Sequence, residues 1–120
     1  FLRTALLYLA DDIWPCTRVD RIYSANVLHM VPEVLGERLL RNTSKVLSTR
    51  GFLLLYGPFK YAGRFTTPSN AQFDQWLKAR HPESGVRDFE WVEHLASQTG
   101  LHLTADLAMP ANNQLLIFGT

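Results

Sequence analysis

The apolar run Phe52–Tyr56 constrains the fold of this chain more than any other stretch. It places five apolar residues in a row with no polar alternation, which is typical of a strand in a parallel sheet covered on both faces. The run ends at Gly57-Pro58, where the chain must turn, and Phe59 and Lys60 follow. Because sites of α/β proteins form at the carboxyl ends of such strands, we expect a site near this turn.

The residues before this run predict a strand and a helix. Segment 2–9 is apolar but too short to distinguish a strand from a helix. Segment 21–25 predicts a short buried strand, and Pro32 suits the first turn of a helix. Leucine and valine residues then recur at helical spacing as far as Leu47. A strand, a helix and a second strand in this order predict a βαβ unit with parallel strands.

Two further helices are predicted after the turn. Ser69 is followed three residues later by Gln72, which predicts a capping box at the start of one helix. Asp88 is a candidate cap for the other helix, and Gly100 suits the position just beyond its end.

The C-terminal part predicts two antiparallel strands, at 101–105 and 114–118. The connecting segment 109–113 is too short for the crossover that parallel strands need. The sequence therefore predicts an α/β fold with a mixed sheet that ends in an antiparallel strand pair.

Composition narrows the classes of function. The 120 residues are 47% hydrophobic and fit one small domain with a genuine core. A net charge of +1, without a basic tract or acidic tail, favours a small, roughly neutral ligand over nucleic acid or an anionic membrane. No apolar stretch approaches the ~20 residues of a membrane span. The lone Cys16 excludes an internal disulfide framework, and a reducing, cytoplasmic location is the default expectation.

Several common chemistries lack their sequence signatures. The four histidines have no paired metal-ligand spacing, so we expect no metal site. Neither a Gly-x-Ser-x-Gly elbow nor a Gly-x-Gly dinucleotide fingerprint occurs, which argues against a serine hydrolase and against hydride transfer.

Motifs at successive strand ends carry a resemblance to a known superfamily. Asn26-Val27-Leu28-His29 follows the first predicted strand, and Arg50 to Phe59 spans the second. Both resemble the second half of a class I S-adenosylmethionine-dependent methyltransferase. Narrower motifs resemble the DUF938 family, which includes methyltransferase-like protein 26; among them are Trp14-Pro15, Ser69-Asn70 with Phe73-Asp74, and Met109-Pro110-Ala111-Asn112-Asn113.

The resemblance implies a partial Rossmann-like sheet in three layers, with cofactor and methyl acceptor meeting at the carboxyl ends of the strands. In the family, a glycine-rich turn and an acidic residue hold the cofactor, and both would precede Phe1. We therefore expect residues 1–120 to be a single domain, the C-terminal portion of a methyltransferase-like fold that lacks the N-terminal cofactor-binding strands. The isolated chain is then expected to show no S-adenosylmethionine binding that calorimetric titration detects, and no activity.

The resemblance also implies cofactor contacts. Asp11, Asp12 and Trp14 lie where the family's third strand gives way to the loop beside the adenine, so they are candidates for contacts with that ring. The alternative is a solvated turn beside a core tryptophan, since Trp and Asp near a proline are ordinary. Asn26 is a further candidate for cofactor binding.

The same strand ends carry the candidate catalytic residues. His29 is expected to position the acceptor or take its proton, because imidazole titrates near neutral pH. Asn26 and Tyr56 are expected to position the reactants. A capping asparagine and a packed histidine are the alternative.

Polar residues beyond the turn are candidates for substrate binding. They are Lys60, Asn70, Asp74, Arg87, Asn112 and Asn113. Asn70 and Asp74 stand four residues apart, on one helical face that could line a cleft. The alternatives are a solvated lysine, a structural Arg–Asp network, and asparagines placed by a turn.

Two hypotheses of function follow. In the first, the chain is the C-terminal part of a methyltransferase that acts on a small molecule, with S-adenosylmethionine as cofactor. In the second, it is a truncated, non-catalytic remnant that self-associates or serves as a binding module. A homo-oligomer would then cover the sheet edge where the missing first strand belongs.

Overall fold

The computed structural model describes residues 5–16 and 18–120. The first part of the ambiguous segment 2–9, residues 2–4, therefore lies outside the described residues. From Ala5 to Tyr8 this segment is neither helix nor strand, and Leu6 and Tyr8 are exposed. Leu9 packs against the core, whereas the side chains from Ala5 to Tyr8 are exposed and so fix no regular conformation.

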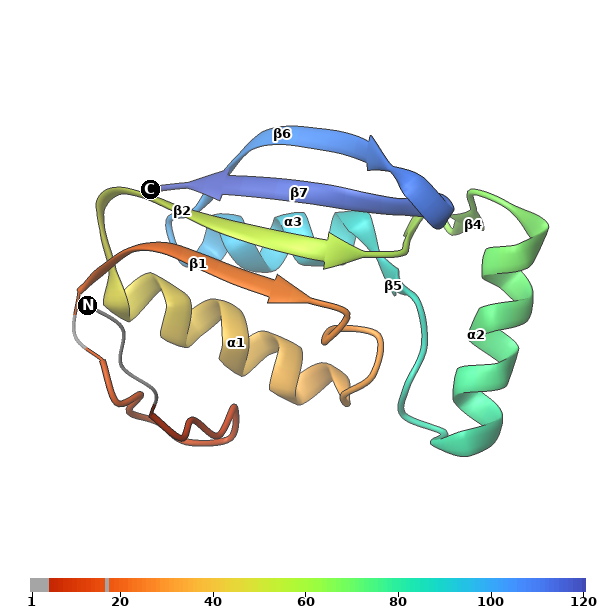
Figure 1. Cartoon of the computed structure of the whole chain (residues 1–120), viewed down its shortest axis with the longest axis horizontal. Coiled ribbons are helices and arrows are strands. Elements are labelled where there is room, and N and C mark those ends of the chain that lie inside the picture. The colour runs from red at the N-terminus through yellow and green to blue at the C-terminus, as the bar shows by residue number, and fades with distance from the viewer. Residues whose placement is uncertain (1–4, 17) are drawn as a thin grey trace.

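The main sheet has four strands in the order β1-β2-β7-β6 (Figure 1). These are β1 (Val19–Ala25), β2 (Leu47–Gly57), β6 (His102–Met109) and β7 (Asn113–Gly119). Strand β1 pairs with β2 in parallel, whereas β7 pairs antiparallel with both β2 and β6. The predicted α/β class, the parallel pair and the C-terminal antiparallel pair are confirmed.

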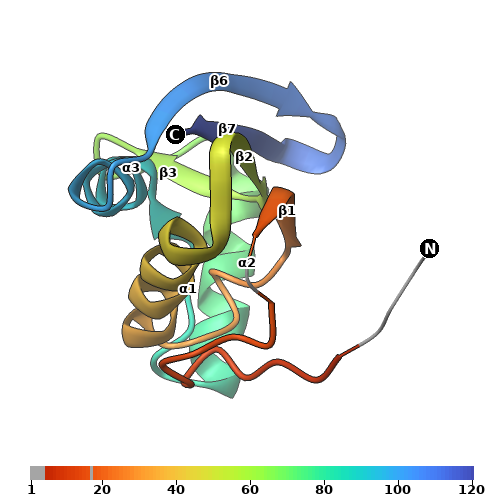
Figure 2. The same cartoon turned by 90° about the vertical axis from the view of Figure 1, so that its left-hand side faces the viewer.

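Helices α1 (Glu33–Val46) and α3 (Phe89–Gln98) cover one face of this sheet (Figures 1 and 2). The core between these helices and the sheet contains Leu40, Val92, Leu53, Leu55, Leu116 and Phe118. In register, Leu53 is opposite Phe118 and Leu55 is opposite Leu116, so alternate residues of two neighbouring strands point into this core. Gly100 follows α3 with a φ of +83°, the left-handed conformation expected just beyond a helix end.

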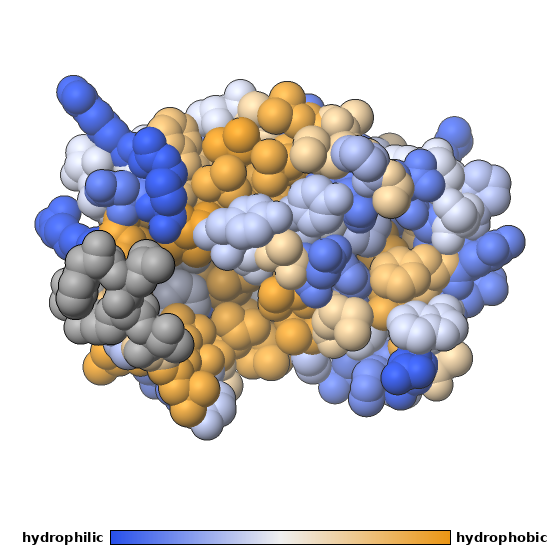
Figure 3. Space-filling view, in the orientation of Figure 1, coloured by the Kyte–Doolittle hydropathy of each residue, from blue (hydrophilic) through white to orange (hydrophobic). Residues whose placement is uncertain are grey.

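The opposite face of the sheet is only partly covered by the described residues. Leu54 and Tyr56 of β2 and Ile117 of β7 are half-buried, and Tyr23 of β1 is 63% exposed. Figure 3 shows apolar surface over the strands in the upper part of the view. Among the described residues, helices cover one face of β2, so the prediction that both faces are covered holds for that face alone.

Helix α2 (Pro68–Arg80) lies beyond the carboxyl ends of β1 and β2 (Figure 1). Its cap is Thr67, whose side chain accepts a hydrogen bond from the Asn70 backbone N–H at 3.1 Å. The predicted capping box is wrong because Ser69 is already inside the helix, after Pro68 at its first position. Asp88 precedes α3 as predicted, but its side chain forms no capping hydrogen bond.

Short elements connect α2 to the sheet. Strands β3 (Phe59–Tyr61), β4 (Arg64–Phe65) and β5 (Arg87–Asp88) form a small second sheet. A 3₁₀ turn, η1 (Pro110–Asn112), joins β6 to β7 at the same end of the molecule as α2. No helix among the described residues is long and apolar enough to span a membrane.

Candidate functional site

A pocket of about 290 Å³ opens at the carboxyl ends of β1 and β2, between these strands, the start of α2 and turn η1. Its lining residues are uncharged: Asn26, His29, Pro58, Ser69, Asn70, Phe73, Ala111, Asn112 and Asn113. Four separate parts of the sequence therefore meet at the edge of the sheet where parallel strands end.

Asn26 and His29 approach each other across Gly57 in this pocket. A Cβ atom built on Gly57 would lie 3.5 Å from His29 Nδ1 and 4.0 Å from Asn26 Oδ1. Asn26 adopts a φ of +59°, and its backbone N–H donates to the Tyr56 carbonyl at 2.8 Å. Asparagine tolerates this left-handed conformation better than most residues do, so the local sequence turns the chain sharply after β1.

The imidazole of His29 is buried at the base of the pocket. The side chain is 5% exposed and packs edge-on against the Phe73 ring, with 5.5 Å between ring centroids. Burial, and secondly the nearby positive charge of Arg87, lower the pKa of His29 below its ordinary value. His29 is therefore uncharged at neutral pH and keeps a lone pair that can accept a proton.

Arg87 fixes the loop that carries His29. Its guanidinium donates to the carbonyls of Leu28 at 3.1 Å, Val31 at 2.7 Å and Glu83 at 2.6 Å. The same loop is held from the other side by the Gly85 N–H, which donates to the His29 carbonyl at 3.0 Å. Arg87 thus acts on the loop and does not line the pocket.

Turn η1 and the residue after it, which we call the rim, line the pocket through Ala111, Asn112 and Asn113. Asn70 Nδ2 donates to the Asn112 carbonyl, and Asn112 Nδ2 donates to Ser69 Oγ, both at 3.1 Å. Asn113 Nδ2 reaches the Tyr56 hydroxyl at 3.3 Å. Ala111 and Asn112 both have left-handed backbones, with φ of 61° and 60°. These bonds between η1 and α2 hold the strained turn in place.

Three of the expected substrate-binding residues lie outside the pocket: Arg87, Lys60 and Asp74. Lys60 Nζ faces Asp88 Oδ1 at 3.7 Å and lies over the Phe65 ring. Asp74 is buried, accepts the Val86 N–H at 2.8 Å and pairs with Lys78 at 2.9 Å. These two charged side chains, like Arg87, already have partners within the fold.

The candidates for adenine contacts lie beside α1 and not at the pocket. The Asp11 carbonyl accepts from Asn42 Nδ2 at 2.8 Å, and Asp12 pairs with Arg38. Trp14 is buried in the core, and the small hollow beside it is shared with residues near the end of α1. This end of α1 is far from α2 in Figure 1. The structure therefore does not bring Asp11, Asp12 and Trp14 together with His29.

Sequence reasoning missed the pocket roles of Ser69, Phe73 and Ala111. The sequence pattern predicts a capping role for Ser69 and a place on an apolar helical face for Phe73. Their spacing contained the signal, since Ser69 and Phe73 are four residues apart and so share one face of α2 with Asn70. Ala111 carried no signal, because its unusual backbone is imposed by the turn.

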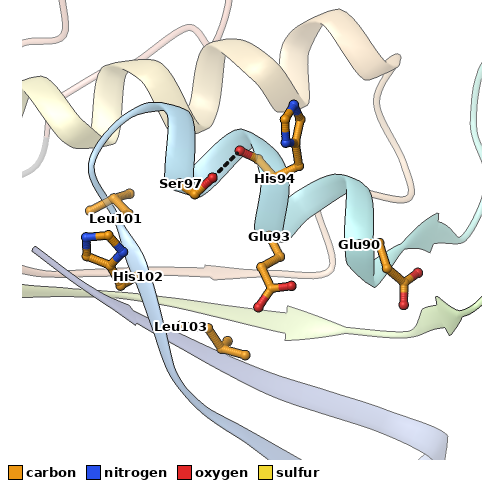
Figure 4. Close-up of a pocket in the computed structure, with 7 residues that line it drawn as sticks. All are labelled: Glu90, Glu93, His94, Ser97, Leu101, His102 and Leu103. Atoms are coloured by element: carbon orange, nitrogen blue, oxygen red, sulfur yellow. Dashed lines mark hydrogen bonds between the residues drawn. The ribbon is translucent and has the colours of Figure 1, made fainter.

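A larger hollow, about 520 Å³, lies between α3 and β6. Figure 4 shows that His94 points away from Glu93 and His102, so the polar side chains that line this hollow do not converge on one point. Among residues 5–16 and 18–120, no three His, Cys, Asp or Glu side chains could together hold a metal ion. Of these two hollows in the described part of the chain, the pocket at His29 is the one whose polar side chains converge.

The arrangement of strands and helices is that of a methyltransferase-like fold. A proposed O-methyltransferase from Nostoc punctiforme PCC 73102 matches with a TM-score of 0.78 and 22% identity, over 93% of this chain and 34% of that chain. LepI in complex with S-adenosylmethionine matches with a TM-score of 0.74 and 16% identity, over 89% of this chain and 28% of that chain. CalO1, a methyltransferase in calicheamicin biosynthesis in its SAH-bound form, matches with a TM-score of 0.70 and 17% identity, over 84% and 30%.

These identities show a shared fold, and the chain spans about a third or less of the length of these structures. The family assignment is narrower. The model of the family described as "Protein of unknown function (DUF938)" matches residues 6–120. The chain therefore belongs to the DUF938 family, and the resemblance seen in its motifs is confirmed at that level.

Proposed function

We propose that this chain provides the acceptor side of an S-adenosylmethionine-dependent methyltransferase site for a small molecule. The observation that carries the proposal is the convergence of Asn26 and His29 on Gly57, at the carboxyl ends of two parallel strands. The hydrogen bonds among the described residues include none to either of these two side chains, so their polar atoms are free for a ligand. We also propose that, within the DUF938 family, the chain corresponds to methyltransferase-like protein 26.

Within this proposal the chain's own residues orient the acceptor and remove its proton. S-adenosylmethionine, when bound, would supply a methyl group on its sulfonium sulfur, and a nucleophile can attack that methyl carbon directly. His29 accepts the acceptor's proton, since its imidazole is uncharged at neutral pH. Asn26 orients the reactants through its amide, and the Tyr56–Asn113 hydrogen bond holds the rim. Orientation within the pocket supplies most of the rate gain.

The described residues fit the reacting end of S-adenosylmethionine and not its nucleoside. Asn26 offers a free amide at the pocket, whereas Asp11, Asp12 and Trp14 are turned toward α1. We propose that strands outside residues 1–120, from a longer chain or a partner, hold the nucleoside. Binding by this chain alone is then too weak for calorimetry but is confined to the pocket.

A nuclear magnetic resonance titration with S-adenosylhomocysteine tests this proposal. Millimolar ligand should shift the amide signals of Asn26, His29 and Gly57. Gly57→Ala should weaken these shifts without unfolding the chain, because the added methyl group meets only ordinary van der Waals contacts beside His29 and Asn26. Lys60→Met is the matched control outside the pocket. Shifts that avoid the pocket, or that survive Gly57→Ala unchanged, would refute the proposal.

The second candidate function is a non-catalytic module that self-associates. It is favoured by the partly covered apolar sheet face and by β1, an edge strand that exposes Tyr23. Edge strands of this kind pair with other chains unless they are covered or charged. The same proposal places the protein in the cytoplasm, where the unpaired Cys16 would stay reduced.

Light scattering separates this candidate from a monomer. We expect a species of twice the chain mass of 13.7 kDa that dissociates on dilution. Tyr23→Lys should favour the monomer by placing a charge on the edge strand, whereas Ser97→Lys on exposed α3 should not. A wild-type monomer at every concentration would rule self-association out.

A further inference from the structure

We infer that the pocket at His29 takes an uncharged, planar ring that carries a hydroxyl group. This inference deepens the proposed function, since it treats the pocket as the acceptor side of the site, and it names the class of acceptor. It stands on the charges, the shape and the free polar atoms of the pocket.

The pocket offers no partner for a charged ligand. None of its nine lining residues is charged. Nearby charges are engaged elsewhere: Lys60 faces Asp88, Asp74 pairs with Lys78, and Arg87 is held by backbone carbonyls. An ionised group that entered the pocket would lose its hydration without gaining a charged partner in direct contact, because Arg87 acts on His29 only from outside the lining, and this loss is costly. Selection against charged acceptors follows.

The shape and one wall of the pocket favour a ring. An apolar cavity of roughly 150 Å³ accommodates benzene, so a pocket of about 290 Å³ has room for one substituted ring. Phe73 provides an aromatic wall, edge-on to His29, and stacks on Trp76 at 5.9 Å between ring centroids. Aromatic pairs prefer such edge-to-face and offset contacts.

The free polar atoms favour a hydroxyl group on that ring. His29 Nδ1 and Asn26 Oδ1 face the same gap at Gly57. The amide oxygen accepts hydrogen bonds, and the uncharged imidazole has one ring nitrogen that does so. An O–H donor satisfies one of them, whereas an ether oxygen satisfies neither. During transfer the acceptor oxygen forms the new O–CH₃ bond, the methyl–sulfur bond breaks with its electron pair left on sulfur, and the hydroxyl proton moves to His29.

Three ring compounds test the inference on the 15N-labelled chain without any cofactor. Phenol, benzoate and benzylamine share a ring but are neutral, anionic and cationic at pH 7.5. Phenol should shift the Asn26, His29 and Gly57 signals saturably, and the two ions should bind at least about tenfold more weakly. Equal or tighter binding of either ion, or phenol shifts outside the pocket, would overturn the inference.

A fourth compound, anisole, isolates the hydroxyl group. In the wild type it should bind more weakly than phenol, and in His29→Gln and Gly57→Ala the difference should shrink. Lys60→Met should leave the difference unchanged, and a well-dispersed spectrum shows that each variant is folded. A phenol preference that persists in both pocket variants would contradict the role of His29.

The outcomes also separate this inference from the proposed function. If phenol binds in the pocket but S-adenosylhomocysteine shifts nothing there, the ligand class stands and methyl transfer falls. If S-adenosylhomocysteine shifts the pocket signals but benzoate is preferred, methyl transfer stands and the neutral acceptor falls.

Discussion

Replacing Arg87 by methionine should destabilise the protein strongly, although the side chain lies outside the pocket. Its guanidinium donates to three backbone carbonyls, and the side chain is 11% exposed. The bonds to Leu28 and Val31 are partly buried, whereas the bond to Glu83 is exposed. Methionine keeps much of the apolar stem and removes the donors together with the positive charge, whose exposed partner Glu33 lies 3.8 Å away.

The magnitude follows from the two partly buried bonds. A hydrogen bond to a charged group contributes about 1.5–3 kcal/mol, and we take the lower value because part of the loop reaches solvent. Two such bonds give an expected loss of about 3 kcal/mol in the free energy of unfolding. Arg80→Met is the control, since Arg80 only stacks on Trp76 at 4.7 Å and should cost about 1 kcal/mol or less.

Urea unfolding followed by circular dichroism measures both variants. The midpoint should fall for Arg87→Met with little change in slope, which indicates a change in stability and not in the compactness of either state. A loss no larger than that of Arg80→Met would refute the assignment of Arg87 to the loop. It would favour the alternative that Arg87 contacts the substrate.

Three further perturbations test other parts of the structure. Thr67→Ala should cost about 1 kcal/mol because it removes the α2 cap. Ser69→Ala should cost less, about 0.5 kcal/mol, because the hydrogen bond from Asn112 that it removes is exposed; equal costs would support the capping box instead. Leu55→Ala should lower the free energy of unfolding by about 2–5 kcal/mol and Leu54→Ala by less, since only Leu55 points into the core between the sheet and the helices. If Leu54→Ala lowered the melting temperature more than Leu55→Ala, the one-sided packing would be contradicted. The pKa of His29 is lower in the folded than in the unfolded chain, so protonation of this group favours the unfolded chain. The free energy of unfolding should therefore be highest above about pH 6.5 and fall as the pH drops below it. This group contributes at most about 1.4 kcal/mol per pH unit to that fall. His29→Gln should reduce that slope, and an unchanged slope in urea titrations would remove His29 as its source.

Local sequence patterns predicted the elements because each pattern reflects a contact made within a few residues. The apolar run at 52–56 and the spacing of leucines up to Leu47 record which side chains enter the core, and both elements formed as expected. The start of α2 was misplaced because two nearby hydroxyl residues can both cap a helix. Pro68 decides between them, since it suits the first helical position and leaves Thr67 as the cap.

The pocket was predictable where residues follow a strand or form a turn. Asn26 and His29 follow β1, Asn112 ends the turn before β7, and Asn113 begins that strand, so strand ends alone place them at one edge of the sheet. Arg87 could not be placed this way. Its carbonyl partners at Leu28 and Val31 stand 59 and 56 residues earlier in the sequence, and no local pattern records such contacts.

The titration of the His29 imidazole, followed by nuclear magnetic resonance, decides whether this side chain can serve the pocket as described. We expect a pKa below the ordinary value of 6.5, ring nitrogen signals of an uncharged imidazole at pH 7.5, and a shift of those signals when phenol is added. A pKa at or above 6.5, or an imidazole that does not respond to phenol, would show that His29 is a packed histidine and not the proton acceptor of the site.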